Sequence, residues 1–160
     1  MEDIISKIEI TKIKNADEIL ILYPEVDENK KAKIKFDVLN DLKDAEAGNR
    51  IIYGAKLNGN IVGTIQLIFK MEKEFYADGI NKAHLHHARV LESLRGKGIG
   101  SFLIKIAEDE ARKRGFKEMT LGVEALNTKA IQLYEKLGYR EFMKEKGDEG
   151  EEIIGMIKIL

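Results

Sequence analysis

The chain has 160 residues, of which 44% are hydrophobic and 34% are charged, and its formal net charge is −1. This balance is typical of a globular protein and argues against a disordered or membrane-spanning chain. We therefore expect one domain over residues 1–160, with a core large enough to fold without disulfides. A net charge so close to zero attracts a phosphate backbone only weakly, which argues against general nucleic-acid binding.

The sequence contains no cysteine, which excludes disulfides, thiolate zinc sites and a cysteine nucleophile. Its first residues, Met1 to Ser6, lack the basic segment and the apolar stretch that form a secretory signal. On this basis we expect a cytoplasmic protein that has no membrane among its partners.

The amino-terminal part of the chain predicts one strand and two helices. Residues 7–13 alternate polar and apolar side chains, as a half-buried strand does. Asn15 is placed as a helix cap, Glu18 supports it three positions later, and Pro24 should end this short helix. The second helix ends before Gly48, and its core-facing apolar stripe consists of Ile34, Val38, Leu42 and Ala45.

A β-hairpin is predicted next. Residues 50–57 and 61–69 are rich in β-branched and aromatic side chains, and residues 58–60, Asn-Gly-Asn, suit a tight turn between them. Residues 70–81 have no clear period and predict an irregular loop, whose Phe75 and Tyr76 either face a partner or cover the core.

The remaining sequence alternates between strands and helices. Residues 83–91 predict a strand, and a helix follows a glycine-rich turn. Residues 118–123 predict the next strand, after which Asn127 caps a helix. Residues 139–146 and 152–160 predict a final hairpin. The buried stripes of the two helices are expected at Ile99, Leu103, Ile106 and Ala107, and at Ala130, Ile131, Tyr134 and Leu137.

The glycine-rich turn runs Arg95-Gly96-Lys97-Gly98-Ile99-Gly100. A strand that enters such a turn and continues as a helix is a phosphate-binding arrangement, because backbone N–H groups and the positive helix end converge on one anion. Arg95 and Lys97 add positive charge, and glycine permits close approach of the backbone. The alternative is a flexible, solvent-exposed turn.

Neither common nucleotide-binding loop matches this turn. A dinucleotide fingerprint needs Gly or Ala three places beyond its second glycine, whereas Ser101 stands at that position after Gly96 and Gly98. A Walker loop needs Ser or Thr after Gly-Lys, whereas Gly98 follows Lys97. A GTP- or NAD-binding domain therefore fits the sequence poorly.

The segment from Val90 to Gly100 resembles motif A of the GNAT N-acetyltransferases, written Arg/Gln-x-x-Gly-x-Gly/Ala, in which Arg95, Gly98 and Gly100 fill the fixed positions. A second signature of that family is an Asn near the start of a later helix, a Tyr further along it and a final Leu-Gly-Tyr. The segment from Asn127 to Tyr139 is similar to it.

This resemblance implies an α/β (α+β) GNAT fold, with a mixed, mostly antiparallel sheet of about seven strands flanked by about four helices. The sheet would be splayed between its fourth and fifth strands, where acetyl-CoA, the cosubstrate, would enter. Pantetheine would pair with backbone near Val90, and the pyrophosphate would lie on the amides of residues 96–101. The implied cofactor-binding residues are Val90, Leu91, Arg95, Gly96, Lys97, Gly98, Ile99, Gly100, Ser101 and Asn127.

Direct acyl transfer needs a neutral amine, donors for the oxyanion and a proton for the departing thiolate. The resemblance places the acid at Tyr134, whose phenol, with a pKa of ~10, is protonated at neutral pH. The alternative role for Tyr134 is core packing. The resemblance also implies a backbone N–H near Val90 as the oxyanion donor.

His84 and His86 are two apart on a predicted strand and therefore share a face, whereas His87 points oppositely unless a bulge intervenes. Imidazole titrates near ~6.5, so it can accept and release protons. Residues 83–86 resemble the corresponding strand of serotonin N-acetyltransferases, which implies proton removal through water. The alternatives are a structural histidine and a zinc site, for which no third ligand is evident, so no metal is expected.

The sequence thus predicts an N-acetyltransferase that acts on an amine of a small molecule or a protein by direct attack. The alternative is a non-catalytic sensor that binds acyl-CoA. The acceptor would lie against the first two helices, residues 23–29 and the 70–81 loop. Glu25, Asp27 and Glu28 could attract a cationic amine, although a solvated acidic loop is the simpler interpretation. The final strands could pair between subunits of a homodimer.

Overall fold

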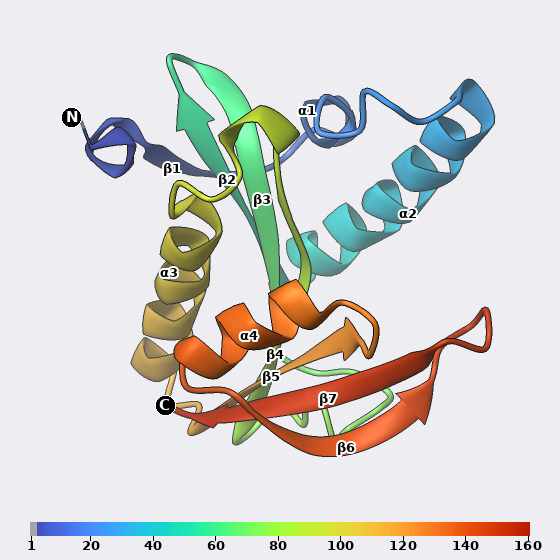
Figure 1. The fold of residues 1–160 in the computed structure, drawn as a ribbon, viewed down its shortest axis with the longest axis vertical. Coiled ribbons are helices and arrows are strands. Elements are labelled where there is room, and N and C mark those ends of the chain that lie inside the picture. The colour runs from blue at the N-terminus through green and yellow to red at the C-terminus, as the bar shows by residue number, and fades with distance from the viewer. Residues whose placement is uncertain (1–2) are drawn as a thin grey trace. The chain divides into compact units, whose positions relative to one another are not determined.

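The structure is a computed structural model that describes residues 3–160. Within this range a 7-stranded sheet has the hydrogen-bonding order β1-β2-β3-β4-β5-β7-β6 (Figure 1). The chain divides into two compact units, residues 1–67 with 87–107 and residues 68–86 with 108–160. Strand β4 (Lys82–Val90) and helix α3 (Ile99–Lys113) contribute residues to both units. No helix in the described range is long and apolar enough to cross a membrane.

The first unit contains the amino-terminal elements. Strand β1 is shorter than expected because Ile4–Lys7 form a 3-10 turn. The Asp3 side chain caps this turn, since its Oδ1 accepts from Ile5 N at 3.0 Å. Asn15 caps the next helix as predicted, since its Oδ1 accepts from Asp17 N at 2.9 Å. The elements are β1 (Glu9–Lys12), α1 (Ala16–Leu20), α2 (Glu28–Glu46), β2 (Arg50–Leu57), β3 (Asn60–Ile68) and a 3-10 turn (Glu92–Leu94).

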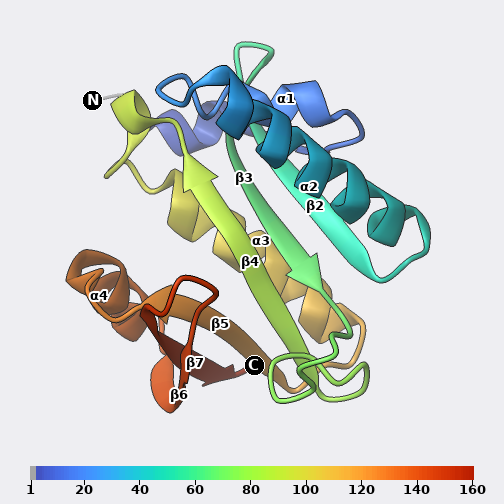
Figure 2. The ribbon, with the colours of Figure 1, turned by 90° about the vertical axis from the view of Figure 1, so that its right-hand side faces the viewer.

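The predicted hairpin between β2 and β3 is confirmed. Asn58 and Gly59 have φ values of 52° and 82°, the pair of positive angles that a type I′ turn requires. Helix α2 lies over β2 and β3 (Figure 2), and its apolar stripe joins a core cluster within this unit. The buried members of the cluster are Ile13, Ala16, Ile19, Leu22, Val38, Ile52 and Ile61.

The second unit contains β5 (Glu118–Glu124), α4 (Thr128–Lys136), β6 (Arg140–Lys146) and β7 (Glu152–Ile159). Strand β7 pairs antiparallel with both β5 and β6, which confirms the predicted final hairpin. The 70–81 segment is irregular as predicted; its Tyr76 is buried with 4% exposure and covers the core, while Phe75 is 38% exposed.

The parallel pair of the mixed sheet is β4 with β5, in the register Lys82↔Glu118 to Leu85↔Leu121. Strand β4 continues to Val90 and β5 to Glu124, so both strands run on beyond the pair Leu85↔Leu121. This is the splay between the fourth and fifth strands that the sequence led us to expect.

Helix α4 is less buried than its pattern predicts. The stripe of Ala130, Ile131, Tyr134 and Leu137 is half-buried, and α4 has no fully buried residue. The stripe nevertheless faces inward relative to the exposed Gln132 and Glu135. Periodicity therefore identified the correct face of the helix, but the degree of burial depends on the neighbouring elements.

A buried charge network ties α3 to the final hairpin within the second unit. Glu108 is 5% exposed, and its carboxylate accepts from Tyr139 Oη at 2.7 Å and from Lys158 Nζ at 3.1 Å. Burial is the largest cause that raises the pKa of Tyr139, followed by the Glu108 charge. The phenol therefore stays protonated and serves as a permanent donor to Glu108.

Tyr139→Phe should lower the free energy of unfolding by about 2 kcal/mol, because it removes one donor from a buried carboxylate. Urea denaturation would measure this change. The matched control is Tyr134→Phe, the same substitution on the half-buried face of α4, for which we expect a loss below about 0.5 kcal/mol. Equal stability of the Tyr139 variant and the unmodified protein would contradict the role assigned to this network.

Candidate functional site

The glycine-rich turn leads directly into α3, which begins at Ile99. Gly96 and Gly98 have φ values of 77° and 91°, in a region that side-chain-bearing residues seldom adopt. Phe102 N donates to Gly98 O at 3.0 Å, so the N–H groups before Phe102 lie at the helix start, where the helix itself offers no acceptor. These groups and the helix dipole suit an anion.

Space around the turn also suits close approach of a ligand to the backbone. A Cβ built on Gly96 would meet no heavy atom within 4 Å, and on Gly98 or Gly100 the nearest atom would be 3.8 Å away. Arg95 and Lys97 are exposed, whereas the Ile99 side chain is 1% exposed and packs into the core. Ile99 could therefore contact a ligand only through its main chain.

The backbone at the end of β4 is already engaged in part. The Val90 carbonyl accepts from Arg95 Nε at 3.0 Å, and Leu91 N, just beyond the strand, donates to Val62 O at 2.8 Å. Arg95 thus links the strand end to the glycine-rich turn. A pantetheine amide that pairs with the Val90 carbonyl would share it with Arg95 or displace that side chain.

In the second unit, Thr120 fixes the orientation of the His84 ring. The Thr120 hydroxyl lies 2.6 Å from the Tyr76 carbonyl and 2.8 Å from His84 Nδ1. A carbonyl can only accept, so the single hydroxyl hydrogen is donated to Tyr76, and Nδ1 must be the donor to Thr120. The neutral ring therefore carries its proton on Nδ1, and Nε2 is the nitrogen that accepts protons.

His84 and His86 share a face of β4 as predicted, with ring centroids 5.7 Å apart. His84 is 3% exposed, while His86 is partly exposed. The hydrogen bonds of Lys73 and Tyr76 lower the pKa of Glu145 most, and a positive charge on His84 would act in the same direction. Within residues 3–160 no three or more His, Asp or Glu side chains gather in a way that could hold a metal ion.

The predicted residues of α4 lie in the second unit. Asn127 Oδ1 accepts from Ala130 N at 3.2 Å and caps the helix as predicted. Tyr134 is half-buried, with its ring 6.2 Å from that of Tyr139. Burial raises the pKa of Tyr134, so its phenol is protonated well beyond neutral pH.

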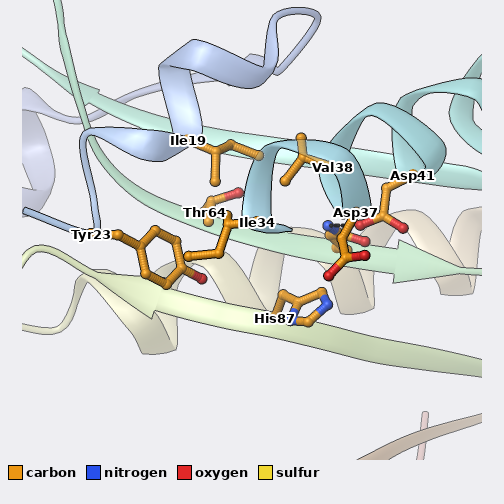
Figure 3. A pocket seen from close by; sticks show the side chains of 9 residues that line it. Ile19, Tyr23, Ile34, Asp37, Val38, Asp41, Thr64 and His87 are labelled. Carbon is orange, nitrogen blue, oxygen red and sulfur yellow. Dashed lines mark hydrogen bonds between the residues drawn. The ribbon is translucent and has the colours of Figure 1, made fainter. Parts of the chain in front are cut away.

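A pocket that the sequence did not predict lies in the first unit, on the face of α2 that covers β3 and the end of β4 (Figure 3). Asp37 from α2 and His87 from β4 point toward one another across it. His87 has a φ of 51°, an unusual value for a residue other than glycine. The pocket is lined by Ile19, Tyr23, Ile34, Asp37, Val38, Asp41, Thr64, Gln66 and His87.

Arg89 packs against Tyr23, one of the residues that line this pocket. Its guanidinium carbon lies 3.9 Å from the centroid of the Tyr23 ring, and its Nε donates to the Leu22 carbonyl at 2.8 Å. Glu25 pairs with Arg89, and Asp27 Oδ1 caps α2 by accepting from Lys30 N at 2.8 Å. Two of the acidic residues singled out in the sequence therefore have structural roles.

The two carboxylates of the pocket have different surroundings. Asp41 pairs with Arg50 at 3.2 Å and accepts from Gln66 Nε2 at 3.0 Å, with 18% of its side chain exposed. Asp37 pairs with Lys33 at 3.1 Å, and their side chains are 50% and 73% exposed. Asp41 is therefore held in place, while Asp37 is the carboxylate that can exchange its partner.

A signal for these residues was present in the sequence. Asp37 and Asp41 follow Ile34 by three and seven positions, so they share its inward face of the helix. Polar residues on an otherwise apolar stripe are the unusual feature. The sequence could not place His87 beside them, because that contact joins segments far apart in the chain.

The structure thus groups the predicted residues within each unit. Val90, Leu91 and the turn from Arg95 to Ser101 lie together in the first unit. His84, His86, Asn127 and Tyr134 belong to the second unit. Their assignments as catalytic or cofactor-binding residues stay predictions.

Comparison with known proteins identifies a family match over most of the chain. The family model described as "Acetyltransferase (GNAT) family" matches residues 14–139. The uncharacterized N-acetyltransferase YhfO of Bacillus subtilis is 33% identical over 111 residues, which cover 64% of this chain and 72% of YhfO. The uncharacterized N-acetyltransferase MJ1207 of Methanocaldococcus jannaschii is 40% identical over 65 residues, but the match covers 41% of this chain and 29% of MJ1207.

A solved structure supports the fold. The PaiA N-acetyltransferase from Thermoplasma acidophilum, in complex with coenzyme A, has a TM-score of 0.70. The alignment covers 96% of this chain and 99% of the PaiA chain, with 23% sequence identity. At this identity the likeness shows a shared fold, and it confirms the GNAT fold expected from the sequence.

The Thr120 contact generates a test of the His84 tautomer. Long-range ¹⁵N–¹H NMR should show His84 protonated at Nδ1, and Thr120→Val should shift the ring toward the Nε2-protonated form, because valine cannot accept the hydrogen bond. Thr64→Val is the control, since the Thr64 hydroxyl donates to the Tyr53 carbonyl instead. An Nε2-protonated ring in the unmodified protein would refute the assignment.

Proposed function

The chain belongs to the acetyltransferase (GNAT) family, and from this premise we propose that it transfers the acetyl group of acetyl-CoA to an amine. The observation that carries the proposal is the turn before α3, where Gly96 and Gly98 adopt positive φ and present an open backbone at a helix start. A pyrophosphate is the ligand class for which such backbone and the cations of Arg95 and Lys97 are suited.

Acetyl-CoA fits the residues that are present. Bound there, it supplies an activated acetyl thioester, and the protein has to orient it, accept a proton from the amine and return one to the thiolate. The main-chain groups of residues 96–101 would hold the diphosphate, and Val90 and Leu91 would lie along the pantetheine. The amide nitrogen of Asn127 supplies a further donor.

Tyr134 is the residue we propose as the general acid. Its half-buried phenol has a raised pKa, so the donated proton is present across the whole physiological range. A phenol returns to its protonated form readily after donation, because its ordinary pKa of ~10 lies above neutral pH. Packing against Tyr139 holds the ring in place.

His84 and His86 are proposed to remove the proton from the amine through water. The Thr120 contact leaves Nε2 of His84 as the accepting nitrogen, and the partly exposed His86 provides a route to solvent. The Glu145 carboxylate would stabilise the positive charge that His84 gains on accepting a proton. His84 alone is too buried to exchange protons with solvent directly.

The family match supports an enzyme over the alternative of a non-catalytic acyl-CoA sensor, because the matched family is one of acetyltransferases. YhfO and MJ1207 both carry N-acetyltransferase in their names. An amine acceptor for this chain is therefore part of the proposal, as is the homodimer in which the final strands could pair.

Binding of acetyl-CoA should be measured first, by isothermal titration calorimetry. We expect micromolar affinity for the unmodified protein and a loss of about 100-fold or more for Gly98→Glu/Gly100→Glu, because two carboxylates would repel the diphosphate. The matched control is Gly48→Glu/Gly150→Glu, which adds the same charges at glycines with φ values of 87° and 83° outside the turn. Absence of binding to the folded, unmodified protein would reject the proposed function.

Tyr134→Phe should lower kcat by about 100-fold or more and leave the Kd of acetyl-CoA unchanged, as expected for loss of a general acid. Thiol release from acetyl-CoA provides the rate. Because burial raises the pKa of Tyr134, loss of its proton should reduce kcat only above about pH 10. Tyr139→Phe, which removes the neighbouring hydroxyl, is the control; equal losses in both variants would assign Tyr134 a packing role.

A further inference from the structure

The pocket on α2 combines an apolar wall with an acidic one. Ile19, Ile34 and Val38 form the apolar side, and the carboxylates of Asp37 and Asp41 form the other (Figure 3). Its volume is about 70 Å³, enough for a few heavy atoms of a ligand. An alkyl chain that ends in a cationic group matches both walls.

The charges around the pocket leave it acidic. Asp41 and Asp44 both pair with Arg50, at 3.2 and 3.0 Å, so this cation is shared between two carboxylates. Asp37 forms an i,i+4 ion pair with Lys33, and both side chains are exposed. Such exposed pairs are worth about 0.3–0.5 kcal/mol, so a ligand ammonium can replace Lys33 at little cost.

His87 does not cancel this negative charge at neutral pH. Although the residue is partly exposed, desolvation by the surrounding atoms is the largest cause that lowers its pKa below the ordinary value; the Arg50 charge also lowers it, whereas the Asp41 and Asp37 charges act in the opposite direction. The neutral imidazole can accept a hydrogen bond from an ammonium group. It lies opposite Asp37, where both groups could contact the same nitrogen (Figure 3).

The pocket lies next to the backbone at which the proposed function places the pantetheine. His87 precedes Val90 by three residues on β4, which corresponds to roughly 10 Å along a strand. A short alkyl chain can cover much of that distance. One ligand could therefore have one end in the pocket and the other near the thioester.

Acyl-transfer chemistry decides which end of the ligand the carboxylates hold. The attacking nitrogen must be neutral, but a carboxylate next to an ammonium group stabilises its protonated form and opposes attack. Asp37 and Asp41 would therefore hinder the reaction if they held the reacting nitrogen. They suit a second cationic group on the same acceptor.

Building on the proposed acetyl transfer, we propose that this pocket binds the non-reacting cationic end of an aliphatic diamine or polyamine acceptor, with Asp37 as the carboxylate that contacts it. Asp41 is held in place by Arg50 and Gln66, and it adds a second negative charge to the acidic wall of the pocket. Tyr23 lines the pocket, and the guanidinium of Arg89 lies over its ring. The acceptor's other amine is then the one acetylated.

The test compares 1,4-diaminobutane with 1-aminobutane, which has the same reacting group and chain but no second cation. With the unmodified enzyme, kcat/KM for the diamine should exceed that for the monoamine at least about tenfold. Asp37→Asn should lower kcat/KM for the diamine about tenfold, mainly through KM, and change the value for the monoamine less than twofold. Equal use of both amines, or an unchanged diamine KM in the variant, would overturn the proposal.

The control is Glu46→Gln, which makes the same charge change at an exposed position of α2 outside the pocket. Thermal denaturation checks that both variants fold. Calorimetric titration of 1,4-diaminobutane, with and without coenzyme A, separates the hypothesis of acetyl transfer from the hypothesis of a diamine-binding pocket. If the diamine binds in a way that depends on Asp37 but acetyl-CoA does not bind, acetyl transfer is rejected and the pocket is retained. If acetyl-CoA binds but the diamine does not, only the pocket is rejected.

Discussion

The short parallel pairing of β4 with β5 is the constraint on which the proposed use of acetyl-CoA depends. The register runs from Lys82↔Glu118 to Leu85↔Leu121, and β4 continues to Val90. Peptide groups beyond the last pair need other hydrogen-bond partners, because a buried group without one is costly. The Val90 carbonyl has one in Arg95, and a pantetheine amide is a chemically equivalent partner. On the proposed function, the first part of the strand serves the sheet and its last residues would bind the ligand.

Recognition in the two proposals rests on different parts of the chain. The pyrophosphate seat consists of backbone N–H groups and of glycine dihedral angles, which any helix start with the right turn can present. The acceptor pocket consists of side chains, with Asp37, Asp41 and His87 among its polar parts. This division is physically sensible, because a family can keep one backbone arrangement for the shared cosubstrate while side chains select the acceptor.

Protonation states in the molecule are set by single contacts. Thr120 has one hydroxyl hydrogen, and its donation to the Tyr76 carbonyl determines which nitrogen of His84 carries a proton. Glu108 receives hydrogen bonds from Tyr139 and Lys158, and the phenol is kept protonated by burial and by that charge. In both cases a buried group has few partners, so the identity of each partner decides the chemistry.

The sequence by itself determined the elements, because their causes are local: Asn58-Gly59 permits only a few tight turns, Asn15 and Asn127 cap helices, and apolar periods select helix faces. It also determined the family, through glycines whose backbone angles few other residues can adopt. Only the tertiary structure decided which ring nitrogen of His84 accepts protons and that Asp37 faces His87. Those contacts join residues far apart in the chain, and no local pattern encodes a distance between side chains on separate elements.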